Sequence, residues 1–224
     1  MLVIEDGLIK INNKIMDKKQ DFIKSYFDAT NKLFGISLDD FVKYYDESKY
    51  SGYPEEPSGS AWESEGKFIY VIIRYLKPRH ILEIGNYLGR GTTNHVLQAV
   101  DMNGYGEVTL LDIMERLEYD KLHSKNFKRV IDNSLNFLSK SFDFDFIIQD
   151  GNHEYHHVKT ELELMEKNAQ NDFIIWSHDY FTVKPPQCEI ARSWADAKVT
   201  KFIERTPLKD SVSNCGFIIS KFVK

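Results

Sequence analysis

Residues 80–100 have the pattern of a strand, a glycine-rich turn and a helix in direct succession. An apolar run at 80–84 precedes the turn, which contains Gly85, Gly89 and Gly91 in the spacing E-x-G-x-x-x-G-x-G. Because glycine has no Cβ, the backbone can turn tightly and its amides can approach a ligand closely. The spacing differs from the dinucleotide fingerprint G-x-G-x-x-G, and it lacks the lysine of a phosphate-binding P-loop.

Strand and helix patterns alternate after this first unit. The strand candidates are residues 80–84, 108–112, 127–131, 144–149 and 173–176, followed by two more at 200–204 and 216–220. Helical stretches lie between the first five, including one with apolar residues at helical spacing from Tyr155 to Met165. Such alternation predicts an α/β fold whose mostly parallel sheet carries helices on both faces.

The first 60 residues have a different pattern. Apolar runs at 2–4 and 8–11 flank Asp6-Gly7, which indicates a hairpin, and two helices are expected next, the second capped by Ser37. Residues 48–60 are rich in glycine and proline and are predicted to form a loop. We therefore divide the chain into an N-terminal hairpin, helices and loop at 1–60 and a main domain at 61–224.

The amino-acid composition limits the classes of molecule that this chain is expected to bind. A length of 224 residues, 42% of them hydrophobic, suits a globular protein with a sizeable core. The net charge of -5 does not favour binding to nucleic acid. No apolar run reaches the roughly 18 residues that span a bilayer, and no signal peptide is evident. With only two cysteines, a cytoplasmic protein without a membrane partner is expected, and the sequence leaves homo-oligomers open.

Polar residues follow the predicted strands at their carboxyl ends. These residues are Glu83, Asp112, Asn133, Ser134, Asp150, His178 and Asp179. A single acid at a strand end is often only a helix cap. In an open α/β sheet, however, ligands bind beyond the carboxyl ends of the strands, where the loops converge. The recurrence of polar residues therefore favours a ligand site, in which Asp112 can accept hydrogen bonds from ribose hydroxyls.

The glycine turn resembles the cofactor loop of class I S-adenosylmethionine-dependent methyltransferases. Asp150-Gly151-x-His153, followed by His178-Asp179-Tyr180, is similar to motifs of a small-molecule O-methyltransferase branch. That branch includes metal-dependent sugar methyltransferases and, more distantly, the catechol type. The resemblance covers roughly residues 60 to 220. It implies a Rossmann-like class I methyltransferase fold, with a seven-stranded sheet, a terminal antiparallel strand and S-adenosylmethionine as cofactor.

The resemblance also implies roles for individual residues. The glycines would line the methionine part of the cofactor, Asp112 would hold its ribose, and Ser134 would lie near the adenine. The full set expected at the cofactor is Glu83, Gly85, Asn86, Tyr87, Gly89, Gly91, Thr92, Asp112, Asn133, Ser134 and Asp150. His153 would be the general base, since an imidazole titrates near neutral pH.

A divalent metal, Mg²⁺, Mn²⁺ or another, is a further implied cofactor, and its ligands would be Asp150, His178 and Asp179. Relatives usually have Asp or Glu where this chain has His178, and imidazole suits zinc, iron or manganese better than magnesium. A site without metal therefore stays open. The implied function is O-methylation of a small hydroxylated molecule, a sugar or secondary metabolite, with or without metal assistance.

Two alternatives compete with this interpretation. His153-Glu154-x-x-His157 satisfies the H-E-x-x-H pattern of zinc metallopeptidases, in which two histidines one helical turn apart share a zinc ion. The motif follows a strand and a turn directly, which is the wrong context for a helix interior, and His156 and His157 are expected to face solvent. The second alternative is a non-catalytic nucleoside-binding protein of the same fold.

Overall fold

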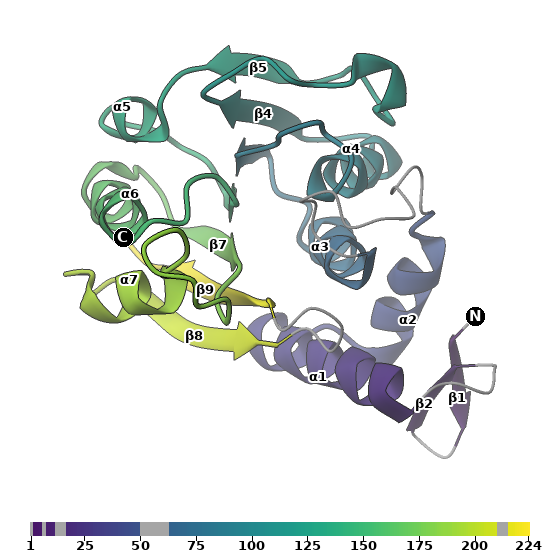
Figure 1. Cartoon of the computed structure of the whole chain (residues 1–224). Helices are drawn as coiled ribbons and strands as arrows, with labels where there is room; N and C mark the ends of the chain where they lie inside the picture. Colours follow the sequence, from purple (N-terminus) through teal and green to yellow (C-terminus); the bar gives the residue numbers. More distant parts are fainter. Residues whose placement is uncertain (1, 6–7, 12–16, 50–62, 210–214) are drawn as a thin grey trace.

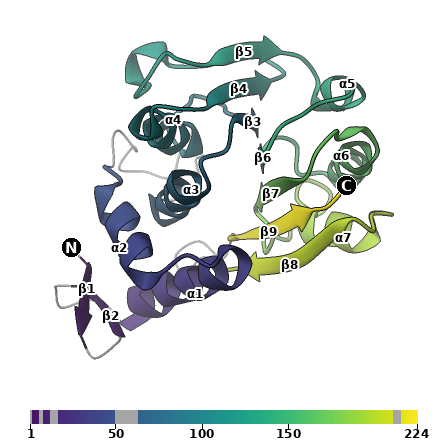
Figure 2. The same ribbon diagram turned by 180° about the vertical axis from the view of Figure 1, so that it is seen from behind.

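The computed structural model describes residues 2–5, 8–11, 17–49, 63–209 and 215–224. A seven-stranded sheet runs through it in the order β5-β4-β3-β6-β7-β9-β8 (Figures 1 and 2). The strands are β3 (His80–Ile84), β4 (Glu107–Asp112), β5 (Lys128–Ile131), β6 (Phe146–Gln149), β7 (Phe173–His178), β8 (Phe202–Leu208) and β9 (Phe217–Phe222). The pairs from β5 to β7 are parallel, and β9 is antiparallel to both of its neighbours. The predicted sheet is confirmed, including its terminal antiparallel strand.

Helices cover both faces of this sheet, as predicted. One face carries α3 (Glu63–Leu76) and α4 (Thr92–Asn103), and the other carries α5 (Ser134–Leu138), α6 (Tyr155–Asn168) and α7 (Ile190–Asp196) (Figures 1 and 2). Side chains of β6 alternate between the two cores: Phe146 and Ile148 enter the first, and Ile147 enters the second. A strand that is buried on both faces is apolar throughout, which explains the continuous apolar runs in the sequence.

The N-terminal helices extend the first core. They are α1 (Asp17–Phe34) and α2 (Leu38–Glu47), and Ser37 caps α2 as predicted by accepting a hydrogen bond from the Asp40 amide at 3.1 Å. The ring of Tyr26 lies 4.6 Å from that of Phe68 and 5.6 Å from that of Phe217, centroid to centroid. These helices are therefore packed against the main domain rather than built around a core of their own.

The N-terminal hairpin pairs as predicted, with β1 (Leu2–Glu5) antiparallel to β2 (Leu8–Ile11) at the edge of the molecule beside α1 (Figure 1). Its turn at Asp6-Gly7 lies outside the described residues. Residues 50–60 of the predicted loop also lie outside them, so the domain boundary after residue 60 stays a prediction.

The main differences from the sequence-based expectation lie in β7, β8 and α7. β7 continues to His178, and β8 lies later than residues 200–204, at Phe202–Leu208. β8 is an edge strand with a register shift between Ile203 and Thr206, and it contains Pro207, which edge strands tolerate. α7 was not predicted, because a seven-residue helix is too short to show a periodic apolar stripe. In the described ranges, no helix combines the length and apolar character needed to cross a membrane.

Candidate functional site

A cavity of about 770 Å³ lies along the carboxyl ends of the parallel strands. The strand register places these ends side by side. Ile84, the last residue of β3, pairs with Leu111 of β4 on one side and with Gln149 of β6 on the other. Loops that follow β3, β4, β5, β6 and β7 all contribute to the wall of the cavity. The sheet therefore gathers residues that are up to 131 positions apart in sequence, from Ile84 to Cys215.

The glycine turn is shaped by a close approach between β3 and β6. Gly85 has a φ of +83°, and its amide donates to the carbonyl oxygen of Leu111 at 2.9 Å. A Cβ added at Gly85 would lie only 2.2 Å from the carbonyl oxygen of Asp150, so no other residue fits here. Tyr87 also has a positive φ, +46°, which is uncommon for a residue with a side chain.

Asp112 is held by the same turn. Its Oδ2 accepts from the Tyr87 amide at 3.0 Å, and its Oδ1 accepts from the Met114 amide at 3.1 Å. Arg116 also donates to Oδ1, at 3.2 Å, and its guanidinium lies 4.8 Å from the centre of the Tyr87 ring. These contacts fix a carboxylate on the cavity wall at the point where the chain leaves β4. Sequence reasoning missed Arg116, because no motif singles it out.

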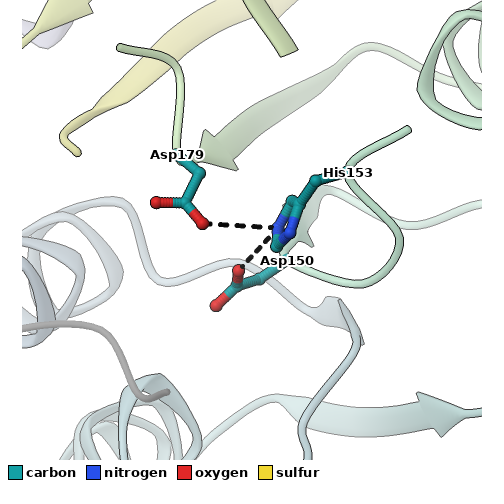
Figure 3. A group of neighbouring side chains, drawn as sticks. All are labelled: Asp150, His153 and Asp179. Carbon is teal, nitrogen blue, oxygen red and sulfur yellow. Dashed lines mark hydrogen bonds and ion pairs between the residues drawn. The ribbon is translucent and has the colours of Figure 1, made fainter. Parts of the chain in front are cut away.

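Three side chains converge at the other end of the cavity (Figure 3). Nε2 of His153 lies 3.2 Å from Oδ1 of Asp150 and 3.8 Å from Oδ2 of Asp179. His153 precedes α6, and Asp179 follows β7 with a φ of +57°. Burial alone would lower the pKa of His153, but its hydrogen bond to Asp150 and the charges of Asp150 and Asp179 raise the pKa above its ordinary value.

His178 bridges two carboxylates behind this group. Its Nδ1 lies 3.1 Å from Oδ1 of Asp150, and its Nε2 lies 3.0 Å from Oε2 of the buried Glu65 on α3. Burial opposes the charge, but Asp150 and Glu65 outweigh it and raise the pKa of His178 well above its ordinary value. Burial also opposes ionisation of Asp150, yet the charge of His178, with the hydrogen bond from His153, holds the pKa of that carboxyl well below its usual range. The site is therefore a network of paired charges.

The sequence of residues 82–180 matches a family model described as a methyltransferase domain. The match begins in β3 and ends directly after Asp179, so it includes the glycine turn, Asp112 and the group around His153. The region from β3 to Tyr180 therefore matches a methyltransferase domain in sequence, and the sheet has the Rossmann-like fold of class I methyltransferases.

Solved structures agree with this domain in fold. An O-methyltransferase from Bacillus cereus, in complex with S-adenosylhomocysteine, is 18% identical, with 90% of this chain and 100% of that chain covered and a TM-score of 0.56. A putative O-methyltransferase from Klebsiella pneumoniae is 14% identical, with 92% and 98% covered and a TM-score of 0.58. TomG of Streptomyces achromogenes, an O-methyltransferase involved in tomaymycin synthesis and solved with S-adenosylmethionine, is 14% identical, with 94% and 100% covered and a TM-score of 0.52. Among curated protein sequences, no significant match was found.

The cavity of the methyltransferase domain contains some of the predicted cofactor residues and not others. Those that line it are Gly85, Tyr87, Asp112, Asn133, Ser134 and Asp150, together with His153, His178 and Asp179. Those that do not line it are Glu83, Asn86, Gly89, Gly91 and Thr92. Members of the second set support the turn; Asn86, for example, accepts a hydrogen bond from Arg129 at 3.1 Å. Their roles toward a cofactor stay predictions.

Glu83 lies beneath the turn rather than in the cavity. Its Oε1 accepts a hydrogen bond from the Thr93 hydroxyl at 3.0 Å, which ties β3 to α4. Burial raises the pKa of this carboxyl to about 8, and the negative charge of Asp150 adds to the effect. At pH 7 Glu83 is therefore mostly neutral.

Replacing Glu83 by Gln is expected to change how stability depends on pH. The folded pKa of about 8 lies above the ordinary value of 4.5, so the wild type loses stability relative to Glu83→Gln as pH rises from 4.5 to 8. The relative change is on the order of a few kcal/mol. Urea unfolding of both proteins at several pH values measures it, and a difference that stays constant across this window would contradict the assignment.

A group that could hold a metal ion is present in the described part of the methyltransferase domain. The ligand atoms of Asp150, His153 and Asp179 all lie within 4.8 Å of one another. His178, predicted as a ligand from sequence, is not a member of this group, and both of its ring nitrogens face carboxylates. The metal role of His178 stays a prediction.

His157 was expected to face solvent, and that expectation is wrong. Its Nε2 lies 2.9 Å from Oγ of Ser134 and 3.1 Å from Oε1 of Glu161, on the cavity wall. The peptidase alternative gains no support, because α6 begins at Tyr155 and His153 lies outside it. The two histidines therefore do not share one helical face, and each is paired with a different acid.

Proposed function

We propose that this methyltransferase transfers the methyl group of S-adenosylmethionine to a hydroxyl oxygen of a small molecule. The observation that carries the proposal is the placement of His153 between two carboxylates at one end of the cavity, with the glycine turn and Asp112 along its wall. O-methylation needs a group that takes up the hydroxyl proton, and an imidazole paired with acids meets that need near neutral pH.

The cofactor would lie along the edge of the sheet. The carboxylate of Asp112 can accept from ribose hydroxyls, as strand-end acids do in nucleoside sites of α/β sheets. Gly85 lets the turn after β3 pass close to the backbone of Asp150, because a side chain at this position would collide with it. When bound, S-adenosylmethionine supplies an electrophilic sulfonium methyl group, and the protein supplies position and electrostatics.

His153 acts on the acceptor. In the neutral ring, Nε2–H donates to Asp150, which leaves the lone pair of Nδ1 to take the hydroxyl proton. Loss of that proton would let the oxygen take the methyl group that the bound cofactor supplies, with a methyl ether and S-adenosylhomocysteine as the products. The imidazolium that forms is stabilised by Asp150 and Asp179, the same charges that raise the pKa of His153.

Asp150, His153 and Asp179 would also fit a divalent cation, since two carboxylates and an imidazole suit manganese, iron or zinc. A metal there would lower the pKa of a bound hydroxyl. The proton transfer described above does not depend on it.

The acceptor is proposed to be a small hydroxylated compound, a sugar or secondary metabolite. A cavity of about 770 Å³ is within the range of small-molecule sites. The solved O-methyltransferases of similar fold, TomG among them, support transfer to oxygen.

The test is an assay with S-adenosylmethionine labelled in its methyl group and a panel of catechols, phenols, monosaccharides and matched amines. We expect labelled methyl ethers, identified by mass spectrometry, from at least one hydroxylated compound and none from the amines. Methylation of amines alone would contradict transfer to oxygen. Binding of S-adenosylhomocysteine without any turnover would favour the nucleoside-binding alternative. The same assays are repeated with EDTA. Loss of methyl transfer in the presence of the chelator would show that the reaction requires a metal ion.

A further inference from the structure

A chain of buried polar side chains crosses the core and ends at the cavity. It runs from Trp194 of α7 through Ser177, Gln149 and Glu161 to His157 and Ser134. Ser177 and Glu161 are completely buried, and Gln149 is 2% exposed. Buried polar groups need hydrogen-bond partners, so the direction of every bond in this chain is constrained by its neighbours.

The direction is set at Trp194, because an indole N–H can only donate. It donates to Oγ of Ser177 at 3.3 Å, and the Ser177 hydroxyl in turn donates to Oε1 of Gln149. The amide nitrogen of Gln149 therefore faces the other way and donates to Oε2 of Glu161 at 2.6 Å. Glu161 acts as an acceptor at this end.

The other carboxylate oxygen of Glu161 determines which ring nitrogen of His157 carries hydrogen. Oε1 lies 3.1 Å from Nε2 of His157, and a carboxylate beside that nitrogen requires it to carry hydrogen. The same Nε2 is 2.9 Å from Oγ of Ser134, so the serine oxygen accepts from the shared N–H. Nε2 consequently has no lone pair with which to activate Ser134 as a nucleophile. The hydrogen of the Ser134 hydroxyl is instead left to point elsewhere, and Ser134 lies on the cavity wall.

Ser134 lies at the end of the cavity away from the group around His153. It follows β5, the outermost parallel strand, whereas Asp112 ends β4 and Asp150 follows β6. With its ribose at Asp112 and its methyl group directed to His153, an adenosyl cofactor would have its base near Ser134 and His157. The edge of the purine opposite the glycosidic bond then faces these side chains, and on adenine that edge contains N1, a hydrogen-bond acceptor.

We propose that His157 and Glu161 are positioning residues that hold the Ser134 hydroxyl as a donor to adenine N1. The proposal rests on the proposed function, because it takes the orientation of the cofactor from it. The proposal also explains how this chain would select adenine. The Ser134 hydroxyl can donate a hydrogen bond to N1 of adenine, whereas a base without an acceptor at that position would leave the hydroxyl without a partner.

Calorimetry with three ligands tests this proposal: S-adenosylhomocysteine and its 1-deaza and 3-deaza analogues, each of which replaces one ring nitrogen by C–H. For the wild type we expect the 1-deaza analogue to bind about tenfold more weakly and the 3-deaza analogue to bind within about twofold. Ser134→Ala should remove the preference for N1, and Ser134→Thr, which keeps the hydroxyl, should restore it.

His157→Ala distinguishes positioning from packing. The serine hydroxyl remains but loses its fixed direction, so the preference for N1 should fall to about threefold or less, whereas a packing role would weaken all three ligands equally and keep the ratio. Glu161→Gln should act in the same direction, and Glu163→Gln, which alters a surface pair with Lys159 on the same helix, should keep the wild-type ratio. Equal wild-type affinity for S-adenosylhomocysteine and its 1-deaza analogue, or an unchanged ratio in His157→Ala, overturns the proposal. Absence of binding by all three ligands overturns the cofactor assignment itself.

Discussion

We expect His153→Ala to lower the rate of methyl transfer by about 10³-fold while the affinity for S-adenosylhomocysteine stays within about twofold. His153 lies beside Asp150 and Asp179, where the acceptor would bind, and it is not among the residues that shape the glycine turn. Removing the imidazole removes the proton acceptor but leaves Gly85 and Asp112 in place. Steady-state rates with the best acceptor of the panel, together with calorimetry, measure the two quantities.

His156→Ala is the matched control. His156 is exposed and lies three residues further along the chain, so its loss should leave both the rate and the affinity unchanged. If His153→Ala weakened cofactor binding as much as it lowered the rate, the residue would have a binding role and the assignment as base would fail.

We expect Gly85→Ala to destabilise the domain by more than about 3 kcal/mol and to abolish cofactor binding. The added Cβ would lie 2.2 Å from the carbonyl oxygen of Asp150 and 2.4 Å from Cα of Gly151, both backbone atoms. Relief of this clash requires the ends of β3 and β6 to separate, which would also move Asp150 within the cavity. Urea denaturation gives the free energy of unfolding, and calorimetry gives the binding.

Gly104→Ala is the control that distinguishes the steric clash at Gly85 from the strain of a positive φ. Gly104 also has a positive φ, +62°, but a Cβ there would meet nothing within 4 Å. Its replacement should cost roughly 1 kcal/mol from the left-handed conformation alone and should leave binding intact. Equal destabilisation by the two substitutions would show that the approach of β6 to Gly85 is not tight.

The sheet and the main site residues could be predicted because their signals are local. Each buried parallel strand is a short apolar run, and the residues directly after it must meet at one edge of the sheet. Gly85, Asp112, Asp150 and Asp179 were found in this way, since each directly follows or closes a predicted strand. The register of the strands then brings them to one cavity without any further assumption.

The site partners that helices contribute could not be assigned from the sequence. Glu65 is in the first turn of α3, where an acid also suits the helix dipole, and only the tertiary contact with His178 reveals its other partner. His157 looked exposed because the apolar stripe of its helix falls on Val158 and Leu162. Its position depends instead on how α5 packs against α6, a contact between segments that are 23 residues apart.

Titration of the wild-type protein with S-adenosylhomocysteine is the most direct test of the central claim. If the cavity formed by the glycine turn, Asp112 and Asp150 is a cofactor site, calorimetry will show saturable binding at one site per chain, and Asp112→Ala will weaken it about tenfold or more by removing the acceptor for the ribose hydroxyls. No measurable heat of binding, with no shift in the melting temperature at millimolar ligand, would contradict the account.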